Sequence, residues 1–294
     1  MFLTSMTEGL DQLTGIQGTL GYVVIILVVL ILRELFWHGS KEAAMPHTSA
    51  VHQPRALKED EESDPPRNFT LEQLRKFNGV VDEKGNETPL YLSVQGTVFD
   101  VSDAKDFYGP GGPYECFAGR ECGVALAKMS FDDTYLDDFD GIEKLNHGER
   151  MELENWIDKF THYRRYPILG KLVPPDKLPD SDRVLTLDEL AQHDGTSNDI
   201  PESFATPPIY LGAGTKVYDV SFGGVEFYGP GGGYHRFAGK NASRALAKMS
   251  FDPEDTNNTS VADLTDDQRK VLADWVRTFE ERKKYPVVGR LKLN

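Results

Sequence analysis

The chain contains the same short stretch twice, and this duplication constrains its fold more than any other feature. Residues 107–114 read Phe-Tyr-Gly-Pro-Gly-Gly-Pro-Tyr, and residues 227–234 read Phe-Tyr-Gly-Pro-Gly-Gly-Gly-Tyr. Alignment of 107–132 with 227–252, at a constant offset of 120 residues, gives 18 identities in 26 positions. Because this offset is about the length of one small domain, the sequence predicts a tandem repeat of a single fold.

The residues before and after the first copy of the stretch predict a mixture of strands and helices. Thr70 and Gln73 have the spacing of a helix capping box. Two β-rich runs, 90–94 and 97–101, are separated by two residues, which is typical of a tight hairpin. A helix is predicted over about 119–130. The sequence therefore predicts an α+β fold for the repeat.

Each repeat is predicted to end with an amphipathic helix and a short closing strand. In the first repeat, Asn146 and Glu149 cap a helix whose apolar face has helical spacing. That face consists of Leu153, Trp156, Ile157 and Phe160, and the closing run covers residues 166–172. The second repeat follows the same order, with capping boxes at 186–189 and 265–268, hairpin runs at 209–211 and 216–220, and a closing run at 285–291.

The N-terminal part of the chain is predicted to be a membrane anchor followed by a tether. Residues 16–37 approach the ~20 mainly apolar residues that cross a bilayer. Arg33 and Lys41 lie at its C-terminal side, which places the tail 1–15 outside the cytosol. A cleaved signal peptide is the alternative, but no basic residue precedes the run. Residues 38–66 are acidic and poor in large apolar side chains, so we expect a disordered tether.

These features divide the remainder of the chain into two domains. The first is predicted over 67–173 and the second over 184–294, with a polar linker at 174–183. The net charge of −15 argues against a nucleic-acid ligand, because phosphate neutralisation needs clustered lysine and arginine.

The two cysteines, Cys116 and Cys122, are too few for a disulfide framework, and we expect reduced thiols. The second repeat has Arg236 and Ala242 at the equivalent positions, which argues against a metal pair.

The Tyr-Gly-Pro stretch has the composition of a ligand site. Glycine and proline fix a turn and leave it free of bulky side chains, so a large flat ligand can approach closely. Aromatic and aliphatic residues around the turn predict an apolar pocket with a few polar groups. Tyrosine is a known axial ligand of haem iron, and a neighbouring cation lowers the pKa of a phenol. The alternative is that these residues only shape the turn.

The residues of both repeats resemble the membrane-associated progesterone receptor family, a branch of the cytochrome b5-like haem/steroid-binding domains. The resemblance rests on the core Phe-Tyr-Gly-Pro-x-Gly-x-Tyr-x-x-Phe-Ala-Gly, on the end of the hairpin (99–102 and 218–221) and on a Trp-x-x-x-Phe helix. It covers 67–172 and 184–291, and it implies two tandem cytochrome b5-like domains after a single N-terminal transmembrane helix. It also agrees with a single-pass protein of the endoplasmic reticulum or another endomembrane, with both domains cytosolic.

The resemblance implies a haem iron ligated by the second tyrosine of the core, which is Tyr114 in the first repeat and Tyr234 in the second. The first tyrosine of the core, and a basic residue and tyrosine after the last helix, would line the site. These residues are Tyr108, Arg165, Tyr166, Tyr228, Lys284 and Tyr285. Both repeats have more residues between the helix tryptophan and the closing tyrosine than the best-known family members. The histidines that hold haem in true cytochromes b5 are absent from the turn, so we expect no six-coordinate electron carrier.

The resemblance implies a non-enzymatic, membrane-anchored protein with at most one haem per domain. Such a protein would carry or sense haem, or assist haem-thiolate monooxygenases and sterol metabolism. The open sixth position of the iron would permit ligand binding or haem-mediated self-association. Two alternatives remain open at this point. One is an adaptor that binds a steroid, another lipid or no cofactor, and the other is redox work with a reductase, which the low potential of a phenolate-ligated iron disfavours.

Overall fold

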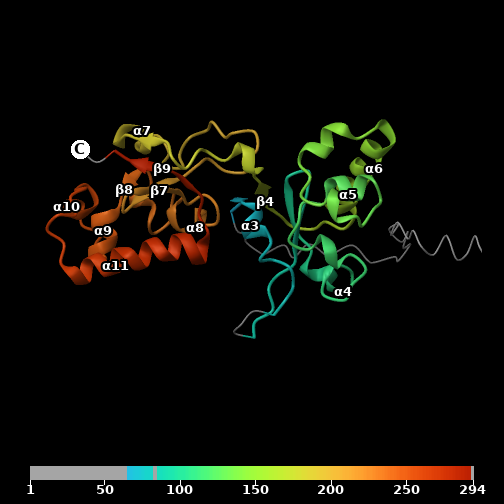
Figure 1. Ribbon diagram of the computed structural model, residues 1–294, viewed down its shortest axis with the longest axis horizontal. Coiled ribbons are helices and arrows are strands. Elements are labelled where there is room, and N and C mark those ends of the chain that lie inside the picture. Colours follow the sequence, from blue (N-terminus) through green and yellow to red (C-terminus); the bar gives the residue numbers. More distant parts are fainter. Residues whose placement is uncertain (1–64, 82–84, 293–294) are drawn as a thin grey trace, which may run out of the picture. The chain divides into compact units, whose positions relative to one another are not determined.

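The computed structural model describes residues 65–81 and 85–292, which contain both repeats (Figure 1). The predicted tail 1–15, the predicted span 16–37 and almost all of the predicted tether 38–66 lie outside the described residues. In the part that is described, no helix combines the length and the apolar character that a bilayer crossing requires.

The first repeat is built on a four-stranded sheet in the order β1-β4-β3-β2. The predicted hairpin is confirmed, because β2 and β3 pair antiparallel with Val94 opposite Thr97. The closing strand β4 pairs antiparallel with β3 and parallel with β1. The strands are β1 (Arg67–Phe69), β2 (Tyr91–Val94), β3 (Thr97–Asp100) and β4 (Ile168–Leu172). The helices are α3 (Leu71–Leu74), α4 (Lys105–Tyr108), α5 (Gly123–Ala127) and α6 (His147–Asp158).

The second repeat has the same arrangement with one additional short strand, in the order β5-β9-β7-β6-β8. Helices α9 and α11 pack against each other in this repeat (Figure 1). The strands are β5 (Val184–Leu185), β6 (Tyr210–Ala213), β7 (Lys216–Asp219), β8 (Lys240–Asn241) and β9 (Val287–Leu291). The helices are α7 (Leu187–Ala191), α8 (Val225–Tyr228), α9 (Ser243–Lys248), α10 (Pro253–Thr256) and α11 (Asp266–Arg277).

Capping boxes begin four helices. Two of these, α3 and α7, follow the first strand of their repeat, and the other two are the long helices α6 and α11. Each cap side chain accepts a hydrogen bond from the backbone N–H three residues later, and the side chain there accepts one from the N–H of the cap. This satisfies two of the donors that a helix start leaves without partners. All four predicted boxes are confirmed, at Thr70, Asn146, Thr186 and Thr265.

An aromatic core connects the sheet of each repeat to its long helix. In the first repeat, Phe99 of β3 and Phe160 meet edge to face, with ring centroids 5.4 Å apart. In the second repeat, Tyr218 and Phe279 form the equivalent contact, also at 5.4 Å. All four rings are at most 1% exposed. Burial of each such side chain contributes roughly 1.5–3 kcal/mol, and it fixes the long helix at the site described below.

Two parts of the fold differ from the sequence prediction. The helix expected over 119–130 is shorter, because α5 begins at Gly123 and Met129 adopts a left-handed backbone with φ of +51°. The parallel edge strands β1 and β5 were not predicted. Gly170 permits the close approach of β1 to β4, because its φ is +145° and a Cβ there would lie 1.8 Å from the carbonyl oxygen of Arg67.

Candidate functional site

The Tyr-Gly-Pro stretch folds into a turn that brings its two tyrosines together. In the first repeat, the N–H of Tyr114 donates to the carbonyl of Phe107 at 2.9 Å. A Cβ on Gly112 would lie 2.5 Å from the same carbonyl, so only glycine fits there. As a result, the rings of Tyr108 and Tyr114 lie with centroids 5.8 Å apart.

The second repeat reproduces this turn. The N–H of Tyr234 donates to the carbonyl of Phe227 at 2.9 Å, and a Cβ on Gly232 would lie 2.3 Å from that carbonyl. The rings of Tyr228 and Tyr234 are again 5.8 Å apart. The duplicated sequence therefore produces the same pair of neighbouring phenols twice.

In the first repeat, a small cavity of about 30 Å³ lies beside this pair of tyrosines. Tyr108 and Tyr114 are each 6% exposed, and the ring of Tyr166 packs edge to face on Tyr108 at 6.5 Å. Three of the predicted site residues of this repeat are thus brought together. The lining consists of Phe107, Tyr108, Tyr114, Trp156, Lys159, Phe160, Arg164 and Tyr166.

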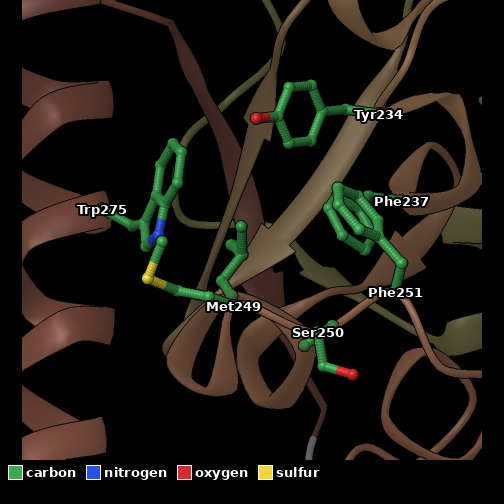
Figure 2. Close-up of a pocket in the computed structure, with 8 residues that line it drawn as sticks. Tyr234, Phe237, Met249, Ser250, Phe251 and Trp275 are labelled. Carbon is green, nitrogen blue, oxygen red and sulfur yellow. The ribbon is translucent and has the colours of Figure 1, made fainter.

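In the second repeat, a cavity of about 70 Å³ lies between Tyr234 and the tryptophan of α11. Figure 2 shows the Tyr234 hydroxyl directed toward Trp275, with Met249 beneath the indole and two phenylalanine rings on the other side. These rings, Phe237 and Phe251, are stacked 5.5 Å apart. Met249 is 74% exposed, so one wall of this cavity is open to solvent.

The two cavities are not at equivalent positions, because their linings match only at one tyrosine and one tryptophan. The first-repeat cavity is bounded by Tyr114 and Trp156, and the second-repeat cavity by their counterparts Tyr234 and Trp275. Both volumes are well below the ~300 Å³ at which small-molecule sites begin. A haem-sized ligand therefore requires that the side chains that line each cavity move apart.

Burial raises the pKa of Tyr108 and Tyr166, which line the first-repeat cavity, and of their counterparts Tyr228 and Tyr285, which lie outside the second-repeat lining. The pKa of Tyr108 is well above its ordinary value because its ring is desolvated, and burial also raises the pKa of Tyr166 and Tyr228. Burial raises the pKa of Tyr285 to about 12, although the Arg67 charge acts in the opposite direction. These four phenols are protonated at neutral pH and can donate hydrogen bonds to a ligand.

The long helix of each repeat ends in a wide π-helical turn, and this turn decides which basic residue faces the site. The turns cover Lys159–Tyr163 and Thr278–Lys283. Arg165, two residues after the first turn, and Lys284, directly after the second, have left-handed backbones with φ of +52° and +55°. Such a backbone reverses the chain direction locally and reorients the side chain relative to its neighbour.

The predicted residues Arg165 and Lys284 therefore differ from the basic residues that lie over the aromatic rings. Arg165 is exposed and is not part of the cavity lining, whereas Arg164 is part of that lining. Lys284 forms an ion pair with Glu72, with Nζ 2.9 Å from Oε1. The preceding lysine, Lys283, lies with Nζ 5.7 Å from the ring centroid of Phe227.

Five lining residues of the first repeat were not among the predicted site residues: Phe107, Trp156, Lys159, Phe160 and Arg164. Trp156 was read only as part of the buried helical face, and Lys159 and Arg164 were not singled out. The signal that could have identified Lys159 and Arg164 is the additional length between the tryptophan and the closing tyrosine, because the π-helical turn lies in this segment.

The donor set of each site suits ferric haem. Each site presents a phenol oxygen in an aromatic environment, and a basic residue lies over the neighbouring phenylalanine ring. A phenol oxygen is a known axial ligand of haem iron. The first-repeat and second-repeat linings contain no histidine, and His235 instead contacts the carbonyl of Tyr228 at 2.9 Å. Within the described ranges, no cluster of three or more His, Cys, Asp or Glu residues could hold a metal ion.

Comparison with known proteins gives the same division into two repeats. A family model described as "Cytochrome b5-like Heme/Steroid binding domain" matches residues 70–172 and 186–292. "Probable steroid-binding protein 3" of Arabidopsis thaliana is 44% identical over 105 residues, which are 36% of this chain and 97% of that protein.

Two further relatives bear names that describe binding or regulation. "Cytochrome P450 regulator dap1" of Schizosaccharomyces pombe is 33% identical over 132 residues, 43% of this chain and 75% of that protein. "Membrane-associated progesterone receptor component 2" of Homo sapiens is 32% identical over 178 residues, 58% of this chain and 73% of that protein. With both repeats matched, the chain belongs to the cytochrome b5-like haem/steroid-binding domain family, in the branch of the membrane-associated progesterone receptors, and carries two tandem copies of the domain.

Proposed function

We propose that this protein is a non-enzymatic haem-binding protein in which Tyr114 and Tyr234 supply the axial ligands. The observation that carries the proposal is that each of these tyrosines lies beside a second, buried tyrosine. The two ring centroids are 5.8 Å apart in both repeats. The membership of the chain in a haem/steroid-binding family supports it.

The two tyrosines of each core would have separate tasks. The phenol oxygen of Tyr114 or Tyr234 would bind the iron, and a five-coordinate ferric haem supplies an open position for a further ligand. Tyr108 and Tyr228 are held protonated by burial, so they suit hydrogen-bond donation rather than iron ligation. In the first repeat, the surrounding aromatic rings would limit the access of water to the iron.

We further propose that the protein is anchored in the endoplasmic reticulum or another endomembrane, with both domains in the cytosol. There it would carry or sense haem, or modulate haem-thiolate monooxygenases and sterol metabolism. The name of the Schizosaccharomyces pombe relative, a cytochrome P450 regulator, supports the modulator role. Exposed haem faces would also permit self-association.

The test is the absorption spectrum of the full chain, purified in detergent micelles and titrated with ferric haem. We expect up to two equivalents bound and a high-spin ferric signal. Tyr114→Phe and Tyr234→Phe should each remove one equivalent of that signal, and the double variant should remove all of it. Tyr163→Phe is the matched control, because Tyr163 is 47% exposed and lies outside the lining. An unchanged ferric signal in the double variant would refute the axial assignment.

The second candidate function is the binding of a steroid or another neutral lipid, with the protein acting as an adaptor. The apolar wall of Phe237, Phe251 and Met249 in the second repeat favours it, as does the name of the Arabidopsis relative. This function predicts saturable binding of a sterol by the haem-free protein and no stoichiometric uptake of haem. Equilibrium dialysis with a labelled sterol, in parallel with the haem titration, separates the two functions.

A further inference from the structure

The first strand and helix of the first repeat, β1 and α3, contact the second repeat, whereas the equivalent surface of β5 and α7 is exposed. Both repeats belong to one compact unit of the chain. Residues 67–73 read Arg-Asn-Phe-Thr-Leu-Glu-Gln, and residues 183–189 read Arg-Val-Leu-Thr-Leu-Asp-Glu. Asn68 and Gln73 are buried, but the residues at the equivalent positions, Val184 and Glu189, are exposed. The same surface is thus an interface in the first repeat and is open to solvent in the second.

Gln73 uses both ends of its side-chain amide at this interface. Its Oε1 accepts from the N–H of Thr70 at 3.2 Å, which completes the capping box of α3. Its Nε2 donates to the carbonyls of Phe222 and Lys283 in the second repeat, each at 2.8 Å. A glutamate can complete the same capping box, as Glu189 does in α7, but its carboxylate has no N–H to donate. The amide of Gln73 is therefore required by the contact between the repeats and not by the helix.

Asn68 makes a second contact of the same kind. Its side-chain Oδ1 accepts from the N–H of Ala205 at 2.7 Å, and its Nδ2 donates to the Ser221 hydroxyl at 2.8 Å. The side chain of Val184, at the equivalent position of the second repeat, has no group that could form either bond. Buried polar groups that are satisfied at both ends fix one relative orientation of the surfaces that they join.

Arg67 fills a space that the second repeat leaves at Gly223. A Cβ on Gly223 would lie 2.6 Å from Cζ of Arg67, and the φ of this glycine is +104°, so no larger residue fits there. The segment 222–226 is one residue longer than its counterpart 103–106 in the first repeat. Burial dominates the pKa of both Arg67 and Tyr285, but Tyr285 raises the pKa of Arg67 and Arg67 lowers that of Tyr285. The guanidinium from the first repeat and the phenol of the second are therefore neighbours.

The closing turn that Gln73 holds, residues 283–285, belongs to the second candidate site. A Cβ on Gly224 would lie 2.8 Å from the Tyr285 hydroxyl and 2.9 Å from the ring of Tyr228, so these two tyrosines pack against the same glycine. Tyr228 is in turn the neighbour of the core tyrosine Tyr234. The interface between the repeats thus reaches the site through the closing turn on one side and the segment 221–224 on the other.

We infer that the first repeat is a positioning partner for the second site. Arg67, Asn68 and Gln73 hold the segment after β7 and the closing turn in place, which keeps Tyr285 packed beside Tyr228. The part of this inference that concerns ligand affinity rests on the proposed function. It has an unusual consequence, because a substitution in the first repeat should weaken binding in the second repeat and leave its own site unchanged.

The first test is hydrogen–deuterium exchange of the closing turn, measured by mass spectrometry on the full chain in detergent micelles. The N–H groups of Lys284 and Tyr285 both donate to the carbonyl of Phe279, so their exchange reports opening of the turn. Gln73→Glu keeps the acceptor of the capping box and removes the donor to the second repeat. Peptides from this turn should then exchange about tenfold faster, because two carbonyls lose their donor.

The chain offers matched controls for this variant. Gln268→Glu makes the same change at the same position of another capping box, that of α11, and should leave exchange at the closing turn unchanged. The equivalent turn of the first repeat, residues 164–166, is the internal control, and its exchange should not respond to Gln73→Glu.

Glu72→Ala is a second, milder variant, which preserves the fold because the Glu72 side chain is 65% exposed. It removes the ion pair with Lys284 and should speed exchange of the closing turn about twofold, as expected for a surface ion pair. Asp188→Ala is its matched control, because Asp188 is the exposed counterpart of Glu72 in α7. If Gln73→Glu does not fold, Glu72→Ala decides in its place.

The second test separates positioning from a purely structural role. Gln73→Glu is combined with Tyr114→Phe, which retains the second proposed haem site, and with Tyr234→Phe, which retains the first. Haem affinity should fall about fivefold in the first combination, because a looser turn must be ordered on binding, and should not change in the second combination.

The inference is overturned if neither Gln73→Glu nor Glu72→Ala speeds exchange of the closing turn, if a control variant has the same effect, or if the turns of both repeats respond equally. It is also overturned if Gln73→Glu weakens haem binding at the first site as much as at the second. Failure of the haem proposal is a separate result, because the exchange measurement needs no ligand and then decides alone whether the first repeat holds this turn.

Discussion

Asp219 offers a quantitative test of the second repeat, because its carboxyl group is fully buried at the end of β7. One oxygen, Oδ1, accepts hydrogen bonds from the N–H groups of Ile209 at 3.1 Å and Ser221 at 2.9 Å. The other, Oδ2, has no partner among the described residues. Burial raises the pKa of Asp219 from 3.8 to about 6, although these hydrogen bonds favour the charged form.

The magnitude follows from linkage between protonation and folding. A pKa raised in the folded state means that stability is fully present below the unfolded value of 3.8 and is lost as the pH rises through about 6. A shift of roughly two units corresponds to about 3 kcal/mol. The asparagine in the Asp219→Asn variant does not titrate. The free energy of unfolding of this variant, relative to that of the wild type, should therefore increase by about 3 kcal/mol between pH 3.5 and pH 7.

The assay is chemical denaturation of the full chain at closely spaced pH values. At each pH, the free energy of unfolding of the variant is subtracted from that of the wild type. Subtraction cancels the other titrating groups, and any cost of the asparagine N–H groups is a constant offset. Asp100→Asn is the matched control, because Asp100 is the equivalent residue in the first repeat and is only half-buried. A difference between Asp219→Asn and the wild type that does not change with pH would refute the reasoning.

Three further changes test other parts of the fold. Asn146→Ala should lower the free energy of unfolding by about 1 kcal/mol, because it removes the capping box of α6, and the denaturation midpoint measures this loss. Gly170→Ala should destabilise the protein by roughly 2–3 kcal/mol, because its Cβ would collide with the carbonyl of Arg67 in β1; a midpoint equal to that of wild type would contradict the close strand approach. Cys122 is fully buried and burial raises its pKa, so iodoacetamide should modify Cys116 in the native protein and Cys122 only on unfolding, as peptide mass spectrometry will show.

The sequence predicted most elements of each repeat because their signals are local. A capping box, a two-residue hairpin and a helical apolar face each depend on residues a few positions apart. The parallel strands β1 and β5 could not be predicted in this way, because each has only two or three residues and is defined by its pairing with a strand about a hundred residues later. Such pairing depends on tertiary contacts rather than on propensity.

In the first repeat the cavity lining contains the three predicted tyrosines but not the predicted cation, and in the second repeat it contains Tyr234 but not Tyr228, Lys284 or Tyr285. The turn fixes Tyr108 and Tyr114 through glycines whose role is visible in the sequence. The basic residue was expected at position 165, yet the lining contains Arg164. Residue spacing does not reveal whether a helix ends in an α or a π turn, and that difference shifts every later side chain relative to the site.

The wide turn at the end of the long helix has a consequence for the history of the protein. Both repeats have this turn and the left-handed residue after it, whereas the charges along the turn differ. The most economical history is that the ancestral single domain already contained this turn before it was duplicated, and that the charges changed afterwards.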